Sequence, residues 1–372
     1  MPSISRRTCL QRLALALPAT LAPGLCAGAE ATAPSGTETD AIAAVAKTFM
    51  EKFEVPALSV AFAVGEHQVF SAGYGLADKA AREETTPAHR FRIASVAKPV
   101  TSVAIFRLVE QGKLKLDDWV FGAGRWIDID LPPESQAKLD EVTIHHLLDH
   151  TCGGWSNQRD DPMFMHPDLG HRELIERTLR DRPLDHPPGT HYAYSNFGYC
   201  LLGRIIEKIS TTSYEDSIKE AVLKPCGITR MQIAGNTRAE RAKNEVVYYD
   251  GEHPYGMNVR RMDSHGGWLA SAGDLVKFLI HTERPDGLLK PASIATMTTA
   301  PPCHPGYACG WAVNAVRNRW HNGSLPGTSS IAVRTASGMS WAALTNVRRE
   351  GIDLALDRMM WQMAKAVPAW KA

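Results

Sequence analysis

The periodicity of apolar positions changes several times along this chain, and each change marks a different predicted element. Helical spacing in "AIAAVAKTFMEKF" (residues 41–53) predicts an amphipathic helix. Two β-rich runs follow, "ALSVAFAV" (57–64) and "HQVFSAGYG" (67–75), and the short break between them predicts a hairpin. Helical spacing returns from Val96 and stops at Gly112, a residue type that often follows a helix C-terminus.

The middle of the chain, about residues 126–264, predicts mostly helices separated by segments rich in Pro, His and Asp. Its helical pieces are "TIHHLLDHT" (143–151), "HRELIERTL" (171–179), "YCLLGRIIEKI" (199–209) and "YEDSIKEAVLKP" (214–225).

The last hundred residues become rich in β-forming residues again. Before them, "GGWLASAGDLVKFLI" (266–280) predicts a helix with Ser271 as N-cap and Asp274 three residues later. A final helix is expected in "GIDLALDRMMWQMAKAV" (351–367). The strand-like runs between these helices are "RWHNGSLPG" (319–327), "TSSIAVRTA" (328–336) and "SWAALTNV" (340–347).

Because β-rich segments lie at both ends of the chain, we expect one antiparallel sheet made from N- and C-terminal segments. Helices would flank this sheet, and a mostly helical lobe would be inserted between its two halves, which makes the fold class α+β. In this interpretation residues 41–372 form a single domain. Its α/β part comprises residues 41–125 and 265–372, and its helical lobe residues 126–264.

The first 29 residues differ from the rest and predict an export signal. They combine a basic start, an apolar middle broken by prolines, and small residues at 27–29. The pair Arg6-Arg7 is typical of a twin-arginine signal, so a periplasmic or secreted protein is expected. Residues 30–40 are interpreted as a flexible leader. No other segment is long and apolar enough to span a bilayer.

Composition excludes some classes of function. The chain has 372 residues, of which 44% are hydrophobic and 22% charged, as in ordinary globular proteins. The formal net charge is +1 without a long run of one sign, so nucleic acid is not an expected partner. Five cysteines lie beyond the predicted signal, without a C-x-x-C pair. Cys303 and Cys309 are close enough in sequence to form a disulfide, and free, packed thiols are an equally good interpretation.

Candidate chemistry begins at "FRIASVAKPV" (91–100), where Ser95 and Lys98 lie one helical turn apart at the start of a predicted helix. A serine hydroxyl needs a proton acceptor to become a good nucleophile, and a lysine at this position can supply one. The spacing S-x-x-K alone is weak, because a chain of this length contains about one such match by chance. A serine at a helix start is also far more often an N-cap.

Two further motifs change this interpretation. "PPGTHYAYSNFGY" carries Tyr194 and Asn196 after a proline-glycine turn, and "WHNGSLPG" lies on a predicted strand near the C-terminus. With these motifs in this order, the chain resembles the serine hydrolases related to class C β-lactamases and low-molecular-weight penicillin-binding proteins. The resemblance spans about residues 45–350. It includes the blocks "GYGLAD", "VTIHHLLDHTCGG", "GGWLASAGDLVKFL" and "GYACGWAV".

The resemblance implies a role for each motif residue. Ser95 would be the acylated nucleophile and Lys98 its proton acceptor, which requires a lysine pKa below the usual value of about 10.4. Tyr194 would share protons with the lysine and activate the leaving group or water, for which a phenol needs a cationic neighbour. The expected substrate-binding and oxyanion residues are Asn196, the backbone N–H groups of Ser95 and Ser324, Gly323, which would let substrate approach closely, and His321.

The third motif departs from the β-lactamase pattern. His321-Asn322-Gly323 stands where class C β-lactamases have lysine-threonine-glycine. A histidine is largely neutral at pH 7 unless a neighbour supports its charge, so the cation that pairs with a β-lactam carboxylate is missing. We therefore expect weak turnover of β-lactams.

Competing motifs do not match. G-x-S-x-G is absent, and "HHLLDH" (145–150) places His146 and His150 four apart without the H-E-x-x-H pattern of zinc enzymes. We expect no metal and no cofactor. The sequence thus predicts an exported serine hydrolase with an acyl-enzyme mechanism. Its expected substrates are small molecules: first a carboxylic ester, then a D-amino-acid peptide, then a β-lactam. A penicillin-binding-like protein that releases its acyl group very slowly remains open.

Overall fold

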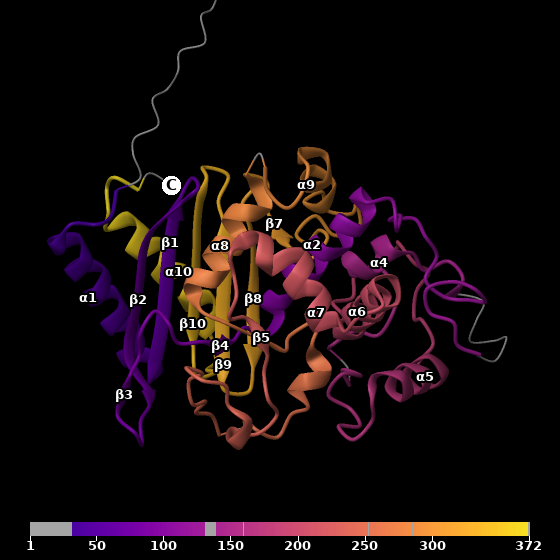
Figure 1. The fold of residues 1–372 in the computed structure, drawn as a ribbon, viewed down its shortest axis with the longest axis horizontal. Helices are drawn as coiled ribbons and strands as arrows, with labels where there is room; N and C mark the ends of the chain where they lie inside the picture. Colours follow the sequence, from indigo (N-terminus) through magenta and orange to yellow (C-terminus); the bar gives the residue numbers. More distant parts are fainter. Residues whose placement is uncertain (1–31, 131–138, 159, 252, 285, 371–372) are drawn as a thin grey trace, which may run out of the picture. The chain divides into compact units, whose positions relative to one another are not determined.

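The computed structural model describes residues 32–130, 139–158, 160–251, 253–284 and 286–370, and these residues belong to one compact unit (Figure 1). The predicted signal at residues 1–29 lies outside the described residues. The helices are α1 (Gly36–Phe53), α2 (Ala97–Glu110), α4 (Ile144–Leu148), α5 (His171–Asp181), α6 (Asn196–Ser210), α7 (Tyr214–Ile218), α8 (Ala272–Glu283), α9 (Pro291–Met297) and α10 (Ile352–Lys365). Short 3-10 turns include Ala94–Val96 and Val259–Met262, and a π-helical turn spans Lys219–Leu223.

Within the described residues, ten strands form two sheets. The strands are β1 (Ala57–Val64), β2 (His67–Asp78), β3 (Glu83–Glu84), β4 (Phe91–Arg92), β5 (Gln232–Ile233), β6 (Trp268–Ala270), β7 (Ala312–Val313), β8 (Arg319–Leu325), β9 (Thr328–Arg334) and β10 (Met339–Thr345). The larger sheet has the order β3-β2-β1-β10-β9-β8-β7, and its paired strands are antiparallel. The prediction of one antiparallel sheet built from both ends of the chain is confirmed, because β1 pairs with β10 along its length.

Side chains alternate across the central strands and give the large sheet two apolar faces. On β1, Leu58, Val60 and Phe62 pack in one buried cluster with α1 and α10, which cover that face. Ala57, Ala61 and Ala63 point the other way, toward α8 and the cluster that continues into α2 and α6. Small alanines on this second face let α8 lie close to the sheet. Figure 1 shows the indigo hairpin β1–β2 beside the yellow strands of the C-terminal segment.

Several predicted boundaries move for identifiable reasons. Helix α1 begins at Gly36, within the stretch interpreted as a leader, because Ser35 and Glu38 form a capping box there. The predicted helix 266–280 divides in two. Ser271 is the N-cap of α8 as expected, with Asp274 completing its capping box. Trp268–Ala270 instead form strand β6, which pairs with β4 and β5 in the smaller sheet.

Two further findings concern the described residues as a whole. None of their helices combines the length and the apolar composition needed to cross a bilayer. The five cysteines beyond the predicted signal are free thiols, so the alternative of a Cys303–Cys309 disulfide is not what the structure has. Cys303 is exposed, whereas Cys309 is buried.

Candidate active site

Ser95 lies where the chain passes from strand β4 into helix α2. The short 3-10 turn Ala94–Val96 connects them, and Ala94 has a φ of 47°, a left-handed conformation that costs energy for a residue with a Cβ. Ser95 is half-buried, while both of its neighbours are buried. The turn also places the Ser95 N–H among the first N–H groups of a helix, which have no partner within the helix.

The Lys98 side chain extends toward Ser95 and has no exposed surface. Its Nζ atom donates to Ser95 Oγ at 3.1 Å, to Asn196 Oδ1 at 2.6 Å and to the carbonyl of His265 at 3.1 Å. Burial lowers the Lys98 pKa to about 7, and the negative charge of Asp161 opposes this shift. At neutral pH a large fraction of this amine is therefore uncharged, and an uncharged amine can accept the serine proton.

Tyr194 completes the group from the segment that precedes α6. Ser195 holds this segment in place, because its hydroxyl caps α6 by accepting from the N–H of Gly198 at 3.1 Å. Lys98 Nζ lies over the Tyr194 ring, 4.7 Å from its centroid. Burial nevertheless raises the Tyr194 pKa, and a hydrogen bond with Ser95 opposes this by less. The resting phenol is protonated and suited to donate a proton.

Asn196 is held at both ends of its side-chain amide. Its Oδ1 accepts from Lys98, and its Nδ2 donates to Asp161 Oδ2 at 2.6 Å. Asp161 also accepts from the N–H of Met163 at 2.9 Å, while burial raises its pKa. Asn196 therefore orients the lysine from within the protein, in addition to lining the cavity where substrate binding was predicted.

The edge of strand β8 forms the opposite wall. The two-residue turn Pro326-Gly327 connects β8 to β9, and Leu325 faces Thr328 across it. Since hydrogen-bonded and non-hydrogen-bonded pairs alternate from such a turn, Ser324 occupies a non-hydrogen-bonded position and its N–H points away from β9. Strand β7 pairs only with Arg319 and Trp320 of β8, so this N–H meets an open edge.

Contacts within the protein require a glycine at position 323. A Cβ at this position would lie 2.2 Å from the carbonyl oxygen of Ile93 and 2.3 Å from Ser330 Oγ. The glycine therefore brings β8 against the turn that carries Ser95. Gly323 also lines the cavity at Ser95, so close approach of substrate stays a prediction.

His321 lies near Tyr194, and the centroids of the two rings are 6.2 Å apart. The histidine is buried, with 5% of its surface exposed. Its Nδ1 donates to the carbonyl of Asn322 at 2.6 Å, so its Nε2 accepts from the Tyr307 hydroxyl at 2.9 Å. Burial and the nearby charge of Lys98 lower its pKa to about 3. The imidazole is neutral, as the sequence indicated. Its side chain is engaged by the protein and is not among the described residues that line the cavity.

The cavity at Ser95 has a volume of about 440 Å³. Of the predicted residues, Ser95, Tyr194, Asn196, Gly323 and Ser324 line it, and Lys98 lies directly beneath Ser95. Asn322 of the third motif also lines it. Sequence reasoning did not name the other lining residues as site residues: Asn157, Asp161, Phe164, His265, Gly266, Leu325, Arg348 and Asp353. Asn157, Asp161 and Phe164 come from the segment between α4 and α5.

The histidines of "HHLLDH" serve different parts of the structure. Helix α4 ends at Leu148, and His150 follows it with a φ of 63°, outside the helix. His146 belongs to the capping box of α4 with Thr143. His150 Nδ1 accepts from the N–H of Ser195 at 3.2 Å, which fixes the segment that carries Tyr194. Among the described residues, no group of three or more His, Cys, Asp or Glu side chains is placed to hold a metal ion.

Several known proteins are similar to this chain over much of its length. A family model described as Beta-lactamase matches residues 42–361. The chain is 24% identical over 326 residues to "Protein flp" of Staphylococcus aureus (strain MRSA252), which covers 84% of this chain and 64% of that protein. It is 31% identical over 188 residues to "Esterase EstB" of Burkholderia gladioli, covering 48% of this chain and 46% of the esterase. The chain thus spans less than two thirds of the length of either relative.

A solved structure shows the same fold. The octameric penicillin-binding protein homologue from Pyrococcus abyssi superposes with a TM-score of 0.70 and 28% sequence identity. The superposition covers 89% of this chain and 79% of that one.

Proposed function

The chain belongs to the beta-lactamase family of serine hydrolases, and from this premise we propose that it forms an acyl-enzyme at Ser95 and acts first on carboxylic esters. One observation carries the proposal. The Ser95 hydroxyl lies 3.1 Å from the amine of a lysine that is fully buried and has a pKa of about 7. Burying this amine lowers the stability of the folded protein, and activation of a nucleophile explains why it is nevertheless buried.

In the proposed acylation, neutral Lys98 takes the proton from Ser95 as its Oγ attacks the substrate carbonyl carbon. Negative charge then develops on the carbonyl oxygen, between the free N–H groups of Ser95 and Ser324. The carbon–oxygen bond to the leaving group breaks as Tyr194 donates its proton to the departing alkoxide, and the Lys98 ammonium returns a proton to Tyr194. Water then attacks the acyl carbon in the reverse sense, which regenerates Ser95 and releases the acid.

The charges around the cavity support an uncharged ester over an anionic substrate. Among the described residues, Asp161 and Asp353 line it against one guanidinium, that of Arg348, and His321 supplies no cation. A carboxylate on a β-lactam would therefore meet more negative than positive charge. Phe164, 44% exposed, and Leu325 offer an apolar surface for an acyl or alcohol group.

A second candidate substrate is an amide or peptide of an amino acid with a free amine. Asp161 is the specific observation in its favour, because its carboxylate lines the cavity that Ser95 opens into. An ammonium group next to the scissile carbonyl would be attracted there. This candidate corresponds to the D-amino-acid peptide expected second from the sequence.

The test is a substrate panel: p-nitrophenyl esters of increasing chain length, a D-alanine p-nitroanilide with a free amine, a D-Ala-D-Ala peptide and a chromogenic cephalosporin. We expect the esters to be turned over fastest and the cephalosporin slowest. Ser95→Ala should abolish turnover, whereas Ser337→Ala, at an exposed serine of the β9–β10 turn, should leave it unchanged. Full activity in Ser95→Ala would exclude the proposed nucleophile.

A slow-turnover binding protein is the alternative to an enzyme, and mass spectrometry separates the two. After mixing with ester, an enzyme shows a transient acyl adduct on Ser95 or none, whereas a binder keeps the adduct for hours. The intact set of Ser95, Lys98 and Tyr194 supports turnover.

We also propose that the protein is exported through its twin-arginine-like start. The support is the sequence of residues 1–29. Replacing both Arg6 and Arg7 with lysine should leave the protein in the cytoplasmic fraction, whereas a Lys47→Arg control, at an exposed position of α1, should be exported normally. Export of the double variant at the wild-type level would contradict the twin-arginine route.

A further inference from the structure

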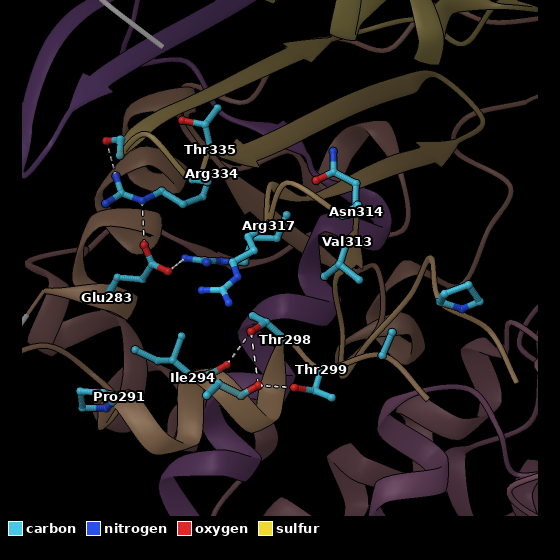
Figure 2. Close-up of a pocket in the computed structure, with 17 residues that line it drawn as sticks. Glu283, Pro291, Ile294, Thr298, Thr299, Val313, Asn314, Arg317, Arg334 and Thr335 are labelled. Atoms are coloured by element: carbon cyan, nitrogen blue, oxygen red, sulfur yellow. Dashed lines mark hydrogen bonds and ion pairs between the residues drawn. The ribbon is translucent and has the colours of Figure 1, made fainter. Parts of the chain in front are cut away.

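A second and larger cavity, of about 830 Å³, lies at the N-terminal end of β8 (Figure 2). Its walls come from the end of α8, from α9, and from the β7–β8 and β9–β10 hairpins. It shares no lining residue with the cavity at Ser95. Its volume is in the range of sites that hold small organic molecules.

The charges that line this cavity do not balance. Arg319 and Arg334 are cross-strand neighbours on β8 and β9, and both contact the carboxylate of Glu283 at the end of α8. The second contact is a hydrogen bond from Arg334 Nε to Glu283 Oε2 at 2.8 Å, drawn in Figure 2. Arg317 adds a third guanidinium, and no ion pair joins it to another described residue. Three cations thus line the cavity with one anion.

Arg319 is the buried member of this group. Its side chain is 9% exposed, and its Nε atom is buried without a hydrogen-bond partner among the described residues. Burial lowers the Arg319 pKa, the charge of Glu283 opposes this, and the charge of Arg334 adds to it. A buried guanidinium is unfavourable when one of its donors has no partner and it shares its counter-ion, here Glu283, with a second arginine. An oxyanion in the cavity would supply the missing negative charge.

The facing wall is apolar. Figure 2 shows Ile294, Thr298 and Thr299 across the cavity from Arg317 and Arg334. The two threonine hydroxyls donate to carbonyls of α9, at 2.8 Å from Thr298 to Ile294 and 2.8 Å from Thr299 to Ala295. Their hydrogen-bonding capacity is thus partly used within the helix. Pro291 and Val313 add further carbon surface to this wall.

We propose that this cavity binds a small organic carboxylate, with its oxyanion on Arg317 and Arg319 and its apolar body against α9. A planar carboxylate matches the fork of donors on a guanidinium, and the apolar wall favours an anion with a hydrocarbon body over a bare inorganic one. The inference concerns a site separate from Ser95 and does not rest on the proposed hydrolase activity.

The test is calorimetric titration of the full chain carrying Ser95→Ala. Hexanoate is the probe, hexanamide its neutral counterpart, and inorganic phosphate the bare oxyanion. We expect saturable binding of one hexanoate, at least about tenfold tighter than hexanamide and phosphate, because both charge and apolar body contribute. No saturable binding of hexanoate, or equal binding of hexanamide or phosphate, would overturn the proposal.

Variants locate the site. Arg317→Ala, at an exposed position that should not affect folding, is expected to weaken hexanoate binding about tenfold. Glu283→Gln removes the competing anion and should tighten binding. Arg284→Ala is the matched control, because Arg284 follows Glu283 but pairs with Asp286 outside the cavity, and it should change nothing. If hexanoate bound the Arg317→Ala variant as tightly as the parent protein but did not bind Arg348→Ala, the binding site would be the cavity at Ser95 and the inference would be overturned.

Discussion

At the scale of single residues, Lys98 illustrates how surroundings decide chemistry. A lysine at the start of a helix is ordinarily solvated and charged. Here α2, α6 and the segment before β6 enclose its side chain completely, so water no longer stabilises the ammonium. The remaining partners are Ser95, one amide oxygen and one carbonyl. None is a carboxylate. The charge of Asp161, which accepts a hydrogen bond from Asn196, raises the Lys98 pKa but does not offset burial.

A first prediction concerns the pH dependence of the reaction. The Lys98 pKa is lowered to about 7, and the neutral amine is the reactive form, so kcat/KM should rise with pH and level off above an apparent pKa near 7. The charge of Asp161 raises the Lys98 pKa, so Asp161→Asn should move this limb to lower pH. The measurement is a pH–rate profile on a neutral ester. Asp160→Asn, one residue away and exposed, is the control. If Asp161→Asn left the apparent pKa of the profile unchanged, the effect of the Asp161 charge on Lys98 would be contradicted.

A second prediction concerns His321→Lys, the change that restores the lysine of class C β-lactamases. The new ammonium would enter a buried site whose partners, Tyr307 and the Asn322 carbonyl, are uncharged, with Lys98 close by. We expect a loss of roughly 3–5 kcal/mol of stability and no gain in cephalosporin turnover. Thermal unfolding of His321→Lys beside His321→Gln, which keeps a neutral polar group, measures this. A lysine variant that melts like wild type and hydrolyses cephalosporins would disprove it.

At the scale of elements, the site depends on how closely β8 approaches the turn before α2. Gly323→Ala tests this approach, because its Cβ would overlap the backbone carbonyl of Ile93. Strand β8 must then move outward and carry the Ser324 N–H away from the oxyanion. We expect kcat to fall by about 10²-fold, with KM changed less, since the contact forms in the transition state.

The matched control for this prediction is Gly273→Ala in α8. A Cβ there has no contact closer than 3.4 Å, and alanine is the better helix former. This variant should keep wild-type kcat and gain slight stability. Wild-type kcat in Gly323→Ala would show that the strand edge does not form the oxyanion site.

Elements with strong local signals were predictable from sequence. The hairpin β1–β2, the N-cap at Ser271 and the strands β8 to β10 all follow from periodicity, capping residues and turn glycines. Strand β6 was predicted as helix because "WLA" is neutral locally and takes its form from pairing with β4 and β5. Pairing between distant segments gives no recognisable pattern of apolar and polar residues in a strand of three residues.

The same reasoning separates the site residues. Ser95, Lys98, Tyr194 and Asn196 stand in motifs with fixed spacing, so the sequence could name them. Asp161, His265 and Asp353 line the cavity from three segments far apart in the chain, and only tertiary packing brings them to Ser95. For Gly323 the sequence identified the residue but not its neighbour, because the close approach of Ile93 is a property of the assembled sheet.

At the scale of the whole molecule, the sheet explains how one cavity draws on both ends of the chain. The pairing of β1 with β10 places the C-terminal hairpins beside the N-terminal segment, and the order β10-β9-β8 then puts the edge of β8 next to Ser95. Asn157, Asp161, Phe164 and Tyr194, from the segments between α4 and α6, close the other side. Chemistry therefore depends on the complete sheet, because β8 supplies one wall of the site.

The cysteines give a final prediction that also belongs to the whole molecule. Cys152, Cys200, Cys226 and Cys309 are buried, and burial raises the pKa of each thiol, to about 12 for the first three. Only Cys303 of the described five is exposed. The native chain without residues 1–29 should therefore show one thiol that reacts rapidly with a disulfide reagent such as DTNB, and five after denaturation without reductant. Cys303→Ser should lose the rapid reaction. If the native protein showed no rapid thiol and the denatured protein only three, Cys303 and Cys309 would be joined, and oxidation in an exported protein would have changed the loop before β7.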